Sequence, residues 1–402
     1  MPAVTGALNG FRVLDFTQGI AGPSASMRLG DAGATVIKIE PLDGDDSRSL
    51  GPSVNGVSAI YTSINRNKRS LALDVASDAG ARVISTLLTD ADVVLVDWTP
   101  DLPDALAYEH MSRSRDELVY CSISPFGERG PMANLPGSEL VAQAMSDYVN
   151  SLGVAFEEPV RVGTDIAAVN TGIFAVQAVV AALMRRSVDG YGQRVAVSLL
   201  GSLLHIRGLL WACISNPDDW FGVFNDGYTK APERGYQTAD GRVFWGLRRG
   251  DSEDWDRLLI ALDMIEYLAD PRFDNYGRMA TSIGRYAPEV KHIWEQAFRD
   301  KQLNADDVIS LIHSIHGDAV PFSNYDTLVH HPQVAAVEAL QDVEHPVAGT
   351  IRTASPAWRF SGTPAGVRRG APTLGQHSDE VLTEAGYAID QVAQLRAERV
   401  IA

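Results

Sequence analysis

Two carboxylates stand at the starts of predicted helices. Asp165 directly precedes an apolar run that begins at Ile166, and Glu139 lies at the start of an earlier predicted helix. An exposed carboxylate can serve as a nucleophile and form a covalent intermediate. Structural roles compete with this one. Thr164 or Asp165 is a natural helix cap, worth about 1 kcal/mol, and the helix dipole favours an acid such as Glu139 at a helix start. For Asp165 we favour the cap.

A second candidate site is the turn at residues 19–23, which follows the apolar segment 11–16. A strand, a glycine turn and a helix resemble a dinucleotide-binding unit, and Glu40 ends the next strand, where a ribose-binding acid would lie. The turn lacks the third glycine and contains Pro23, so nicotinamide binding is not predicted. A helix N-terminus at a sheet edge remains a good place for an anion.

Positive charge for such an anion must be local, because the formal net charge of the chain is −17. Asn67, Lys68 and Arg69 form a short polar and basic cluster with donors suited to phosphate groups. The acidic balance argues against nucleic-acid partners and against binding to anionic membranes.

The remaining composition predicts a soluble protein of a reducing cytoplasm that uses no metal. Cys121 and Cys213 lie far apart, and His330 and His331 have no further ligand at metal-binding spacing. The apolar stretch 173–183 is too short to span a membrane and predicts a buried helix.

The elements that position these residues alternate between strands and helices. Short β-rich apolar segments separated by helical spacing indicate a parallel sheet with helices on both faces, so the predicted fold class is α/β. The predicted strands are 11–16, 35–40, 93–97, 118–124 and 194–198, and the predicted helices are 24–29, 76–88, 138–151, 166–186 and 199–214.

The pattern changes near residue 225. Residues 235–246 predict a hairpin with Asp240-Gly241 as its two-residue turn, and three helical segments follow at 253–262, 289–299 and 305–313. We therefore predict a small α+β domain over 225–325, which separates 1–224 from 326–402. The tail adds a strand at 350–353 and a helix at 378–386.

A series of motifs runs along nearly the whole chain: Val13-Leu-Asp-Phe-Thr with Ala21-Gly-Pro, the segments 29–41, 67–74, 121–127, 137–145, 190–200 and 360–368, and Leu374-Gly-Gln-His-Ser-Asp-Glu380. Together they resemble the class III coenzyme A transferase family (CaiB/BaiF, formyl-CoA transferase-like). The resemblance implies a large Rossmann-like domain built from both chain ends, a small domain, and two ring-shaped protomers interlocked as a homodimer. It also implies an acyl-CoA donor and a small carboxylic acid acceptor.

The family transfers coenzyme A through an aspartate that becomes an aspartyl-CoA thioester, within a pattern similar to I-A-D-x-x-x-G. This chain reads Ile-Ala-Ala-Val-Asn-Thr-Gly over 166–172, so Ala168 occupies the place of the nucleophile. Three explanations are open. The chain carries a deliberate Asp→Ala change, it is a naturally inactive subunit or one partner of a heteromeric transferase, or Asp165 supplies the carboxylate from three residues earlier.

The resemblance assigns further roles. It implies an assisting role for Glu139 and coenzyme A binding by the residues Ile20, Ala21, Gly22, Asn67, Lys68, Arg69 and Trp98, the last flanking adenine. Arg248 and Arg249 stand where the family often has a glycine-rich loop, which suggests a cation for a carboxylate substrate. His205, Trp211, Tyr228 and Trp245 are candidates for an acyl site, although core packing is the expected fate of each.

Other functions remain possible. An α-methylacyl-CoA racemase shares the fold but needs a His/Asp pair, and residues 111–127 contain no histidine. A non-catalytic coenzyme A-binding subunit would explain Ala168 directly, and a CoA-thioester lyase is a third possibility. The sequence leaves open the acyl donor, the acceptor acid and the pathway.

Overall fold

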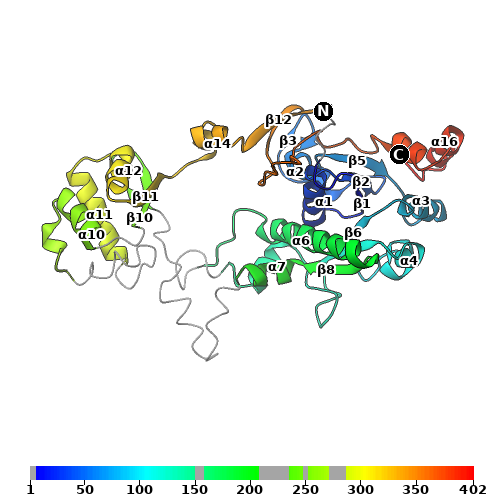
Figure 1. The fold of residues 1–402 in the computed structure, drawn as a ribbon, viewed down its shortest axis with the longest axis horizontal. Coiled ribbons are helices and arrows are strands. Elements are labelled where there is room, and N and C mark those ends of the chain that lie inside the picture. The colour runs from blue at the N-terminus through cyan, green and yellow to red at the C-terminus, as the bar shows by residue number, and fades with distance from the viewer. Residues whose placement is uncertain (1–5, 150–157, 208–234, 248–251, 271–286) are drawn as a thin grey trace. The chain divides into compact units, whose positions relative to one another are not determined.

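The computed structural model describes residues 6–149, 158–207, 235–247, 252–270 and 287–402. They form two compact units, shown in Figure 1. The first unit contains the described residues of 1–152, 160–206 and 332–402, and the second contains those of 207–331 with 158–159. The domain boundary predicted at residue 225 lies outside the described residues, as do Trp211, Tyr228, Arg248 and Arg249.

A six-stranded parallel sheet forms the centre of the first unit. All five predicted strands are present, and the mixed α/β class is confirmed. The strand order is β5-β2-β1-β6-β7-β8. The strands are β1 (Arg12–Asp15), β2 (Thr35–Glu40), β5 (Lys68–Ala72), β6 (Val93–Asp97), β7 (Val119–Ser124) and β8 (Arg194–Ser198).

The strand β5 was not predicted, because it opens with Lys68 and Arg69. It pairs in parallel with β2, from Val36 opposite Lys68 to Glu40 opposite Ala72, and every one of its residues is buried. Because the first two residues of this strand are charged, the sequence does not show the apolar pattern that predicts a buried strand. A partner for each charge makes their burial possible.

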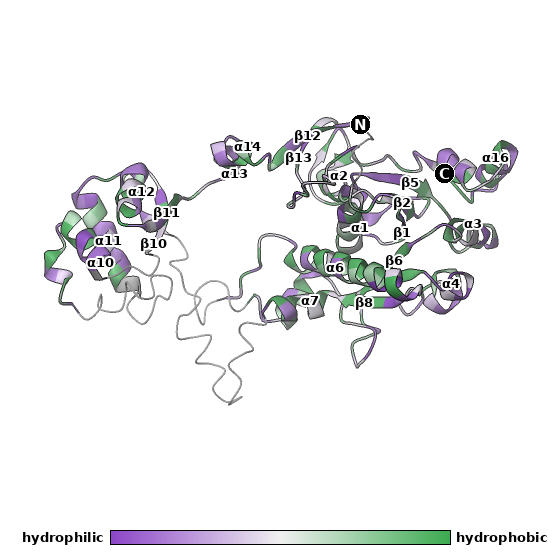
Figure 2. Ribbon diagram, in the orientation of Figure 1, coloured by the Kyte–Doolittle hydropathy of each residue, from purple (hydrophilic) through white to green (hydrophobic). Residues whose placement is uncertain are grey.

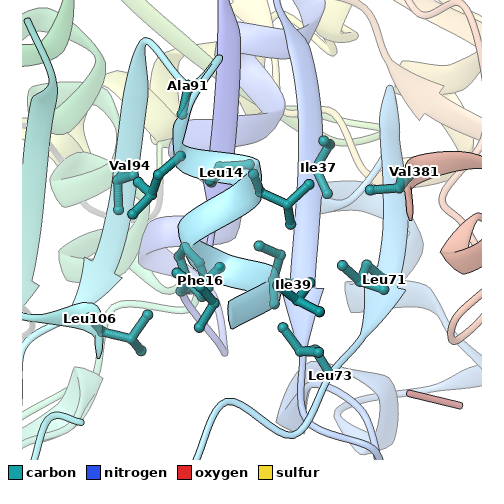
Figure 3. Close-up of a cluster of buried hydrophobic side chains, with 14 of the residues drawn as sticks. Leu14, Phe16, Ile37, Ile39, Leu71, Leu73, Ala91, Val94, Leu106 and Val381 are labelled. Carbon is teal, nitrogen blue, oxygen red and sulfur yellow. The ribbon is translucent and has the colours of Figure 1, made fainter. Parts of the chain in front are cut away.

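Helices cover both faces of the sheet, and successive strand residues point to opposite faces. One face packs Leu14, Ile37 and Leu71 against helices at the chain's end, as Figure 3 shows with Val381 beside Leu71. The other face packs Val13 and its neighbours against α1 and α6. The helices around the sheet are α1 (Ala21–Asp31), α3 (Asp78–Leu88), α4 (Tyr108–Ser114), α6 (Ile166–Asp189), α15 (Ser378–Glu384) and α16 (Ile389–Ala397).

Shorter elements connect this framework. The helix predicted over 138–151 is shorter and ends at Met145, and the described part of the helix predicted from residue 199 ends at Ile206. The shorter elements of the first unit are η1 (Asp46–Ser49), β3 (Ser53–Val54), β4 (Val57–Ser58), α2 (Ala59–Ile64), η2 (Asp104–Leu106), α5 (Glu139–Met145), α7 (Leu199–Ile206), α14 (Pro332–Ala336), β12 (Leu340–His345) and β13 (Gly349–Ala354).

The last residues of the chain complete the first unit beside β5. Ile401 forms an antiparallel bridge with Leu73, and the Asp74 amide donates to the carbonyl of Val400 at 2.9 Å. Asn67 donates from its side chain to the carbonyl of Gly366 at 2.8 Å. Segments more than 290 positions apart thus share one edge of the sheet.

The second unit has its own sheet and core. Its strands lie in the order β11-β10-β9, and Trp245, Trp294 and Phe298 are buried among its helices. The predicted hairpin is confirmed, but its loop runs from Thr238 to Gly241 and so has four residues instead of two. The elements are β9 (Tyr236–Gln237), β10 (Arg242–Leu247), α10 (Ser252–Ala261), η4 (Ile265–Tyr267), α11 (Ala287–Asp300), α12 (Ala305–Ser314), β11 (Gly317–Pro321) and α13 (Tyr325–Val329).

The helix α6 is long and apolar, and Figure 2 colours much of it as hydrophobic. By length and composition alone it could cross a membrane. Ala175, Val179 and Ala182 are nevertheless buried in the core of the first unit, whereas Met184 and Val188 are exposed. The prediction of a buried helix over 173–183 holds for one face of α6.

Candidate functional site

The N-terminus of α6 is bound by the side chain of Glu139. The backbone N–H of Ala167 donates to Oε1 of Glu139 at 2.8 Å, and that of Ala168 donates to Oε2 at 2.8 Å. The first N–H groups of a helix lack partners within the helix, and a carboxylate there is also favoured by the dipole. The structure therefore brings together Glu139 and Ala168, which the sequence singled out separately.

Asp165 does not cap α6 in the predicted way. It occupies the cap position, but its side chain makes no capping hydrogen bond. Its carboxylate instead accepts a hydrogen bond from Arg161 at 2.9 Å. The predicted cap position is confirmed, but the capping hydrogen bond expected there is absent, because Glu139 accepts the N–H groups of Ala167 and Ala168.

Gln143, one turn after Glu139 in α5, fixes the orientation of the carboxylate. Its Nε2 donates to Oε1 of Glu139 at 2.7 Å, while its own Oε1 accepts from the Val162 amide at 3.1 Å. The Gln143 side chain is fully buried. Because its amide oxygen is already used by Val162, the nitrogen must face Glu139. The sequence analysis missed this residue, although a spacing of four places it on the same face of the helix as Glu139.

The helix α6 lies tightly against the start of α1 at Gly172. A Cβ atom added to Gly172 would stand 2.1 Å from Oγ of Ser24 and 2.8 Å from the carbonyl oxygen of Ala21. Ala168 lies one helical turn before Gly172 on the same face. The expected nucleophile position is therefore on the face of α6 that packs against α1, one turn from the contact of Gly172 with Ala21.

Groups beneath the turn that precedes α1 hold its backbone in place. The amide of Gln18 donates to Oδ2 of Asp97 at 2.6 Å, and that of Gly19 donates to Oδ1 of Asp45 at 3.1 Å. The buried Lys38 donates to the carbonyl of Thr17. Ile20 and Ala21 are partly exposed at this edge.

The carboxyl group of Asp97 titrates near neutrality. Burial raises the pKa of Asp97 to about 7, against the opposing effects of the Gln18 amide and of Lys38. Trp98 follows it at the end of β6, partly exposed, and its backbone N–H donates to the carbonyl of Ile123 at 2.7 Å. The sequence analysis selected Trp98 and missed Asp97.

The structure does not assemble the side chains of residues 67–69 into one basic patch. Lys68 is fully buried, and its Nζ donates to Asp15 at 3.0 Å and to the carbonyl of Pro23 at 2.9 Å. Burial lowers the pKa of Lys68 to about 8, despite Asp15. Arg69, the next residue in β5, points to the opposite face because strand side chains alternate. There it pairs with Glu380 and Glu384 of α15, at 2.8 Å in each case.

Asn67 is also occupied within the protein. Its Nδ2 donates to Asp31 at 2.7 Å and to Gly366 at 2.8 Å, and its Oδ1 accepts from the amide of Arg368 at 2.7 Å. The contacts of Asn67 tie α1 to the end of the chain, whereas Lys68 supports the first turn of α1 through Pro23.

Two other candidates occupy different surroundings. Trp245 is buried in the core of the second unit, where its ring packs on Tyr236 and Trp294, as expected for core packing. His205 in α7 is exposed, with its ring edge-on to Phe174 at a centroid distance of 4.9 Å. Among the described residues, no group of three or more His, Cys, Asp or Glu side chains is arranged to hold a metal ion.

Comparisons with known proteins identify the family. A profile of CoA-transferase family III matches residues 8–378. The human succinyl-CoA:glutarate CoA-transferase is 30% identical over 389 residues, which cover 94% of this chain and 85% of that protein. A formyl-CoA:oxalate CoA-transferase of Streptomyces avermitilis is 28% identical over 418 residues, covering 99% of this chain and all of the relative. A crystal structure of a CaiB/BaiF family protein from Brucella suis superimposes with a TM-score of 0.80 and 25% identity, covering 95% of this chain and 100% of that one. This chain belongs to CoA-transferase family III.

Proposed function

We propose that this protein transfers coenzyme A from an acyl-CoA donor to a small carboxylic acid. The observation that carries the proposal is the arrangement at the start of α6, where Glu139 binds the backbone of Ala168 on a helix packed against the start of α1. Relatives that match over nearly the whole chain are named as succinyl-CoA:glutarate and formyl-CoA:oxalate CoA-transferases. Small carboxylic acids of this kind are therefore the acceptors to test first.

The proposed chemistry is covalent. A protein carboxylate attacks the thioester carbonyl and expels the coenzyme A thiolate, which leaves a mixed acid anhydride. The thiolate then attacks the protein carbonyl, releases the donor acid and leaves a protein-CoA thioester, from which the acceptor acid takes coenzyme A. Dividing the exchange into these steps lowers each barrier. In the family pattern the carboxylate stands at position 168, where this chain has alanine.

Coenzyme A is proposed to bind at the carboxyl edge of the sheet. The backbone of Ile20, Ala21 and Gly22 would contact it, with Trp98 beside the adenine. Asn67, Lys68 and Arg69 open β5 at the opposite, amino edge of the sheet, and their side chains are occupied by protein partners. They would therefore not bind the phosphates directly, and Lys68 would act by supporting the first turn of α1 through Pro23. An interlocked homodimer in the cytoplasm completes the proposal.

A second function is favoured by Ala168 itself. A side chain of one methyl group cannot attack a thioester, so the chain would serve as the coenzyme A-binding subunit of a heteromeric transferase. A racemase is the weaker alternative, since it requires a histidine that the segment 111–127 lacks.

A direct exchange assay tests the proposal. The unmodified chain and Ala168→Asp are incubated with succinyl-, formyl- or acetyl-CoA and a panel of carboxylic acids, and new CoA esters are separated by chromatography. We expect exchange by the aspartate variant at a rate at least tenfold above the no-enzyme control. Coenzyme A binding without exchange by either protein would instead favour the non-catalytic subunit, and failure to bind coenzyme A would refute both.

A further inference from the structure

The carboxylate that contacts residue 168 belongs to Glu139. Asp165 lies three residues earlier in the chain and is bound to Arg161. Glu139, by contrast, accepts a hydrogen bond directly from the Ala168 amide at 2.8 Å, and its side chain is partly exposed. If this chain performs covalent catalysis, Glu139 is therefore a carboxylate in direct contact with the residue at the expected position.

The two oxygens of Glu139 are in different environments. Oε1 accepts from the Ala167 amide at 2.8 Å and from Nε2 of Gln143 at 2.7 Å. Oε2 accepts only the Ala168 amide among the described residues. A carboxylate offers about four lone-pair sites. One oxygen is thus held by two donors, while the other keeps a lone pair for bond formation.

We propose that Glu139 is the nucleophile of this chain and carries the protein-CoA thioester; the inference rests on the proposed transferase function. Oε2 attacks the thioester carbonyl, and the C–S bond breaks to release the coenzyme A thiolate. The thiolate then attacks Cδ of Glu139, and the Cδ–Oε2 bond breaks to release the donor acid as a carboxylate. The product is a glutamyl-CoA thioester, and neither step adds or removes a proton or needs an oxidant.

The donors to Oε1 suit the second step. When the thiolate attacks Cδ, negative charge develops on Oε1, which already has two donors at 2.7 and 2.8 Å. Donors at 2.7–3.1 Å from an oxyanion are the arrangement that stabilises a tetrahedral intermediate. The Ala167 amide lies at the start of a 24-residue helix, whose dipole favours the same charge. Burial of Gln143 keeps its amide in place before the reaction begins.

Trapping the intermediate tests the proposal. The unmodified chain is incubated with succinyl-, formyl- or acetyl-CoA, and its intact mass is recorded for a coenzyme A adduct. Borohydride then reduces a protein-bound thioester to an alcohol, which peptide mass mapping assigns to one residue. We expect the label on Glu139, its loss in Glu139→Gln, and its retention in Asp165→Asn. Gln143→Leu should keep the label but form it on the order of 10²-fold more slowly, because one oxyanion donor is lost.

The outcomes separate this inference from the function on which it rests. A label on Asp165 or elsewhere overturns the role of Glu139 but supports the transferase. A second outcome is that the unmodified chain forms no label while Ala168→Asp exchanges coenzyme A from the same donor. This outcome also overturns the role of Glu139 but supports the transferase. No label and no exchange by either protein overturns both. If Glu139 had only a structural role, the unmodified chain would form no label, and Glu139→Gln would only lose thermal stability. That result would overturn Glu139 as the nucleophile.

Discussion

Two acidic residues at the ends of neighbouring strands show how environment sets charge near the candidate site. Burial alone would raise the pKa of Asp15, but Lys68 and Lys38, with the Ser26 hydroxyl, hold it well below its usual range. At Asp97 burial prevails and raises the pKa to about 7. Asp15 therefore stays ionised, whereas Asp97 changes its charge near neutral pH beneath the turn before α1.

The pKa of Asp97 makes a prediction about stability. An aspartate in an unfolded chain has a pKa of about 4. The folded chain therefore holds an extra proton between about pH 4 and pH 7, and the stability that this proton contributes is lost as the pH rises through about 7. Asp97→Asn keeps an acceptor for the Gln18 amide and has no proton to lose. Relative to the unmodified chain, it should gain at least about 1 kcal/mol of unfolding free energy between pH 5 and pH 8.

Urea unfolding of the two proteins at several pH values measures this difference. Asp101→Asn, at an exposed position, serves as the matched control and should show no such trend. A free-energy difference that does not change with pH would contradict the prediction.

Among single residues, the sequence pointed to Glu139 and Ala168 as candidates, but it did not predict that they contact each other. The contact joins α5 to α6 and depends on how two helices pack, which the spacing of residues along one chain does not encode. Lys68 and Arg69 were grouped because they are adjacent in sequence. In a strand, adjacent residues point to opposite faces, so β5 separates the two charges.

Among the elements, the contact between α1 and α6 matters most for the site. Gly172 lets α6 approach Ser24 and Ala21 so closely that a methyl group does not fit. The same contact sets the position of Ala168 relative to the turn before α1. A substitution at Gly172 that pushes α6 away from α1 should therefore affect both the free energy of unfolding and ligand binding.

We expect Gly172→Ala to lower the unfolding free energy by about 1–3 kcal/mol, because the added Cβ would stand 2.1 Å from Oγ of Ser24. Coenzyme A affinity, measured by calorimetry, should fall at least several-fold. Adding Ser24→Ala should restore part of both losses. Gly362→Ala, where an added Cβ meets no atom within 4 Å, is the control and should be nearly neutral. Unchanged coenzyme A affinity in folded Gly172→Ala would show that this helix contact does not shape the site.

Most elements were predictable, and the exceptions have physical causes. Strands β1, β2, β6, β7 and β8 carry clear apolar runs, and α10 to α12 were predicted within about two residues at each end. The strand β5 was hidden by buried charges whose partners come from other elements. The loop of the small-unit hairpin is longer than Asp240-Gly241 suggested, because the strand ladder stops at the pair Gln237 and Arg242. Within the loop, the Thr238 amide donates to the Gly241 carbonyl at 2.9 Å.

For the whole molecule, the net charge of −17 opposes the approach of an anionic CoA ester. Several cations at the large sheet are already paired inside the protein, among them Lys38, Arg66 and Lys68. The long-range field is therefore set by the excess of acidic groups. Salt shortens the reach of that field, from about 30 Å at 0.01 M to about 8 Å at 0.15 M.

We expect the association rate of coenzyme A to rise roughly 2- to 10-fold between 0.01 and 0.15 M salt, because screening removes the repulsion. Stopped-flow fluorescence measures this rate. Dephospho-coenzyme A, which carries less negative charge, should show a smaller increase. A rate that falls with salt would reveal a positively charged entrance that dominates the net charge.

The bridge between Leu73 and Ile401 has a consequence for how the protein is made. Residues 67–73 leave the ribosome more than 290 positions before the segments that cover them. At about 5–20 residues per second, the edge of the sheet waits on the order of 15–60 s for its partners. During that time an open strand edge is a template for pairing with other chains. A nascent chain of this protein can therefore pair with other chains at this edge until the segment from Gly366 to Ile401 has been made and covers it.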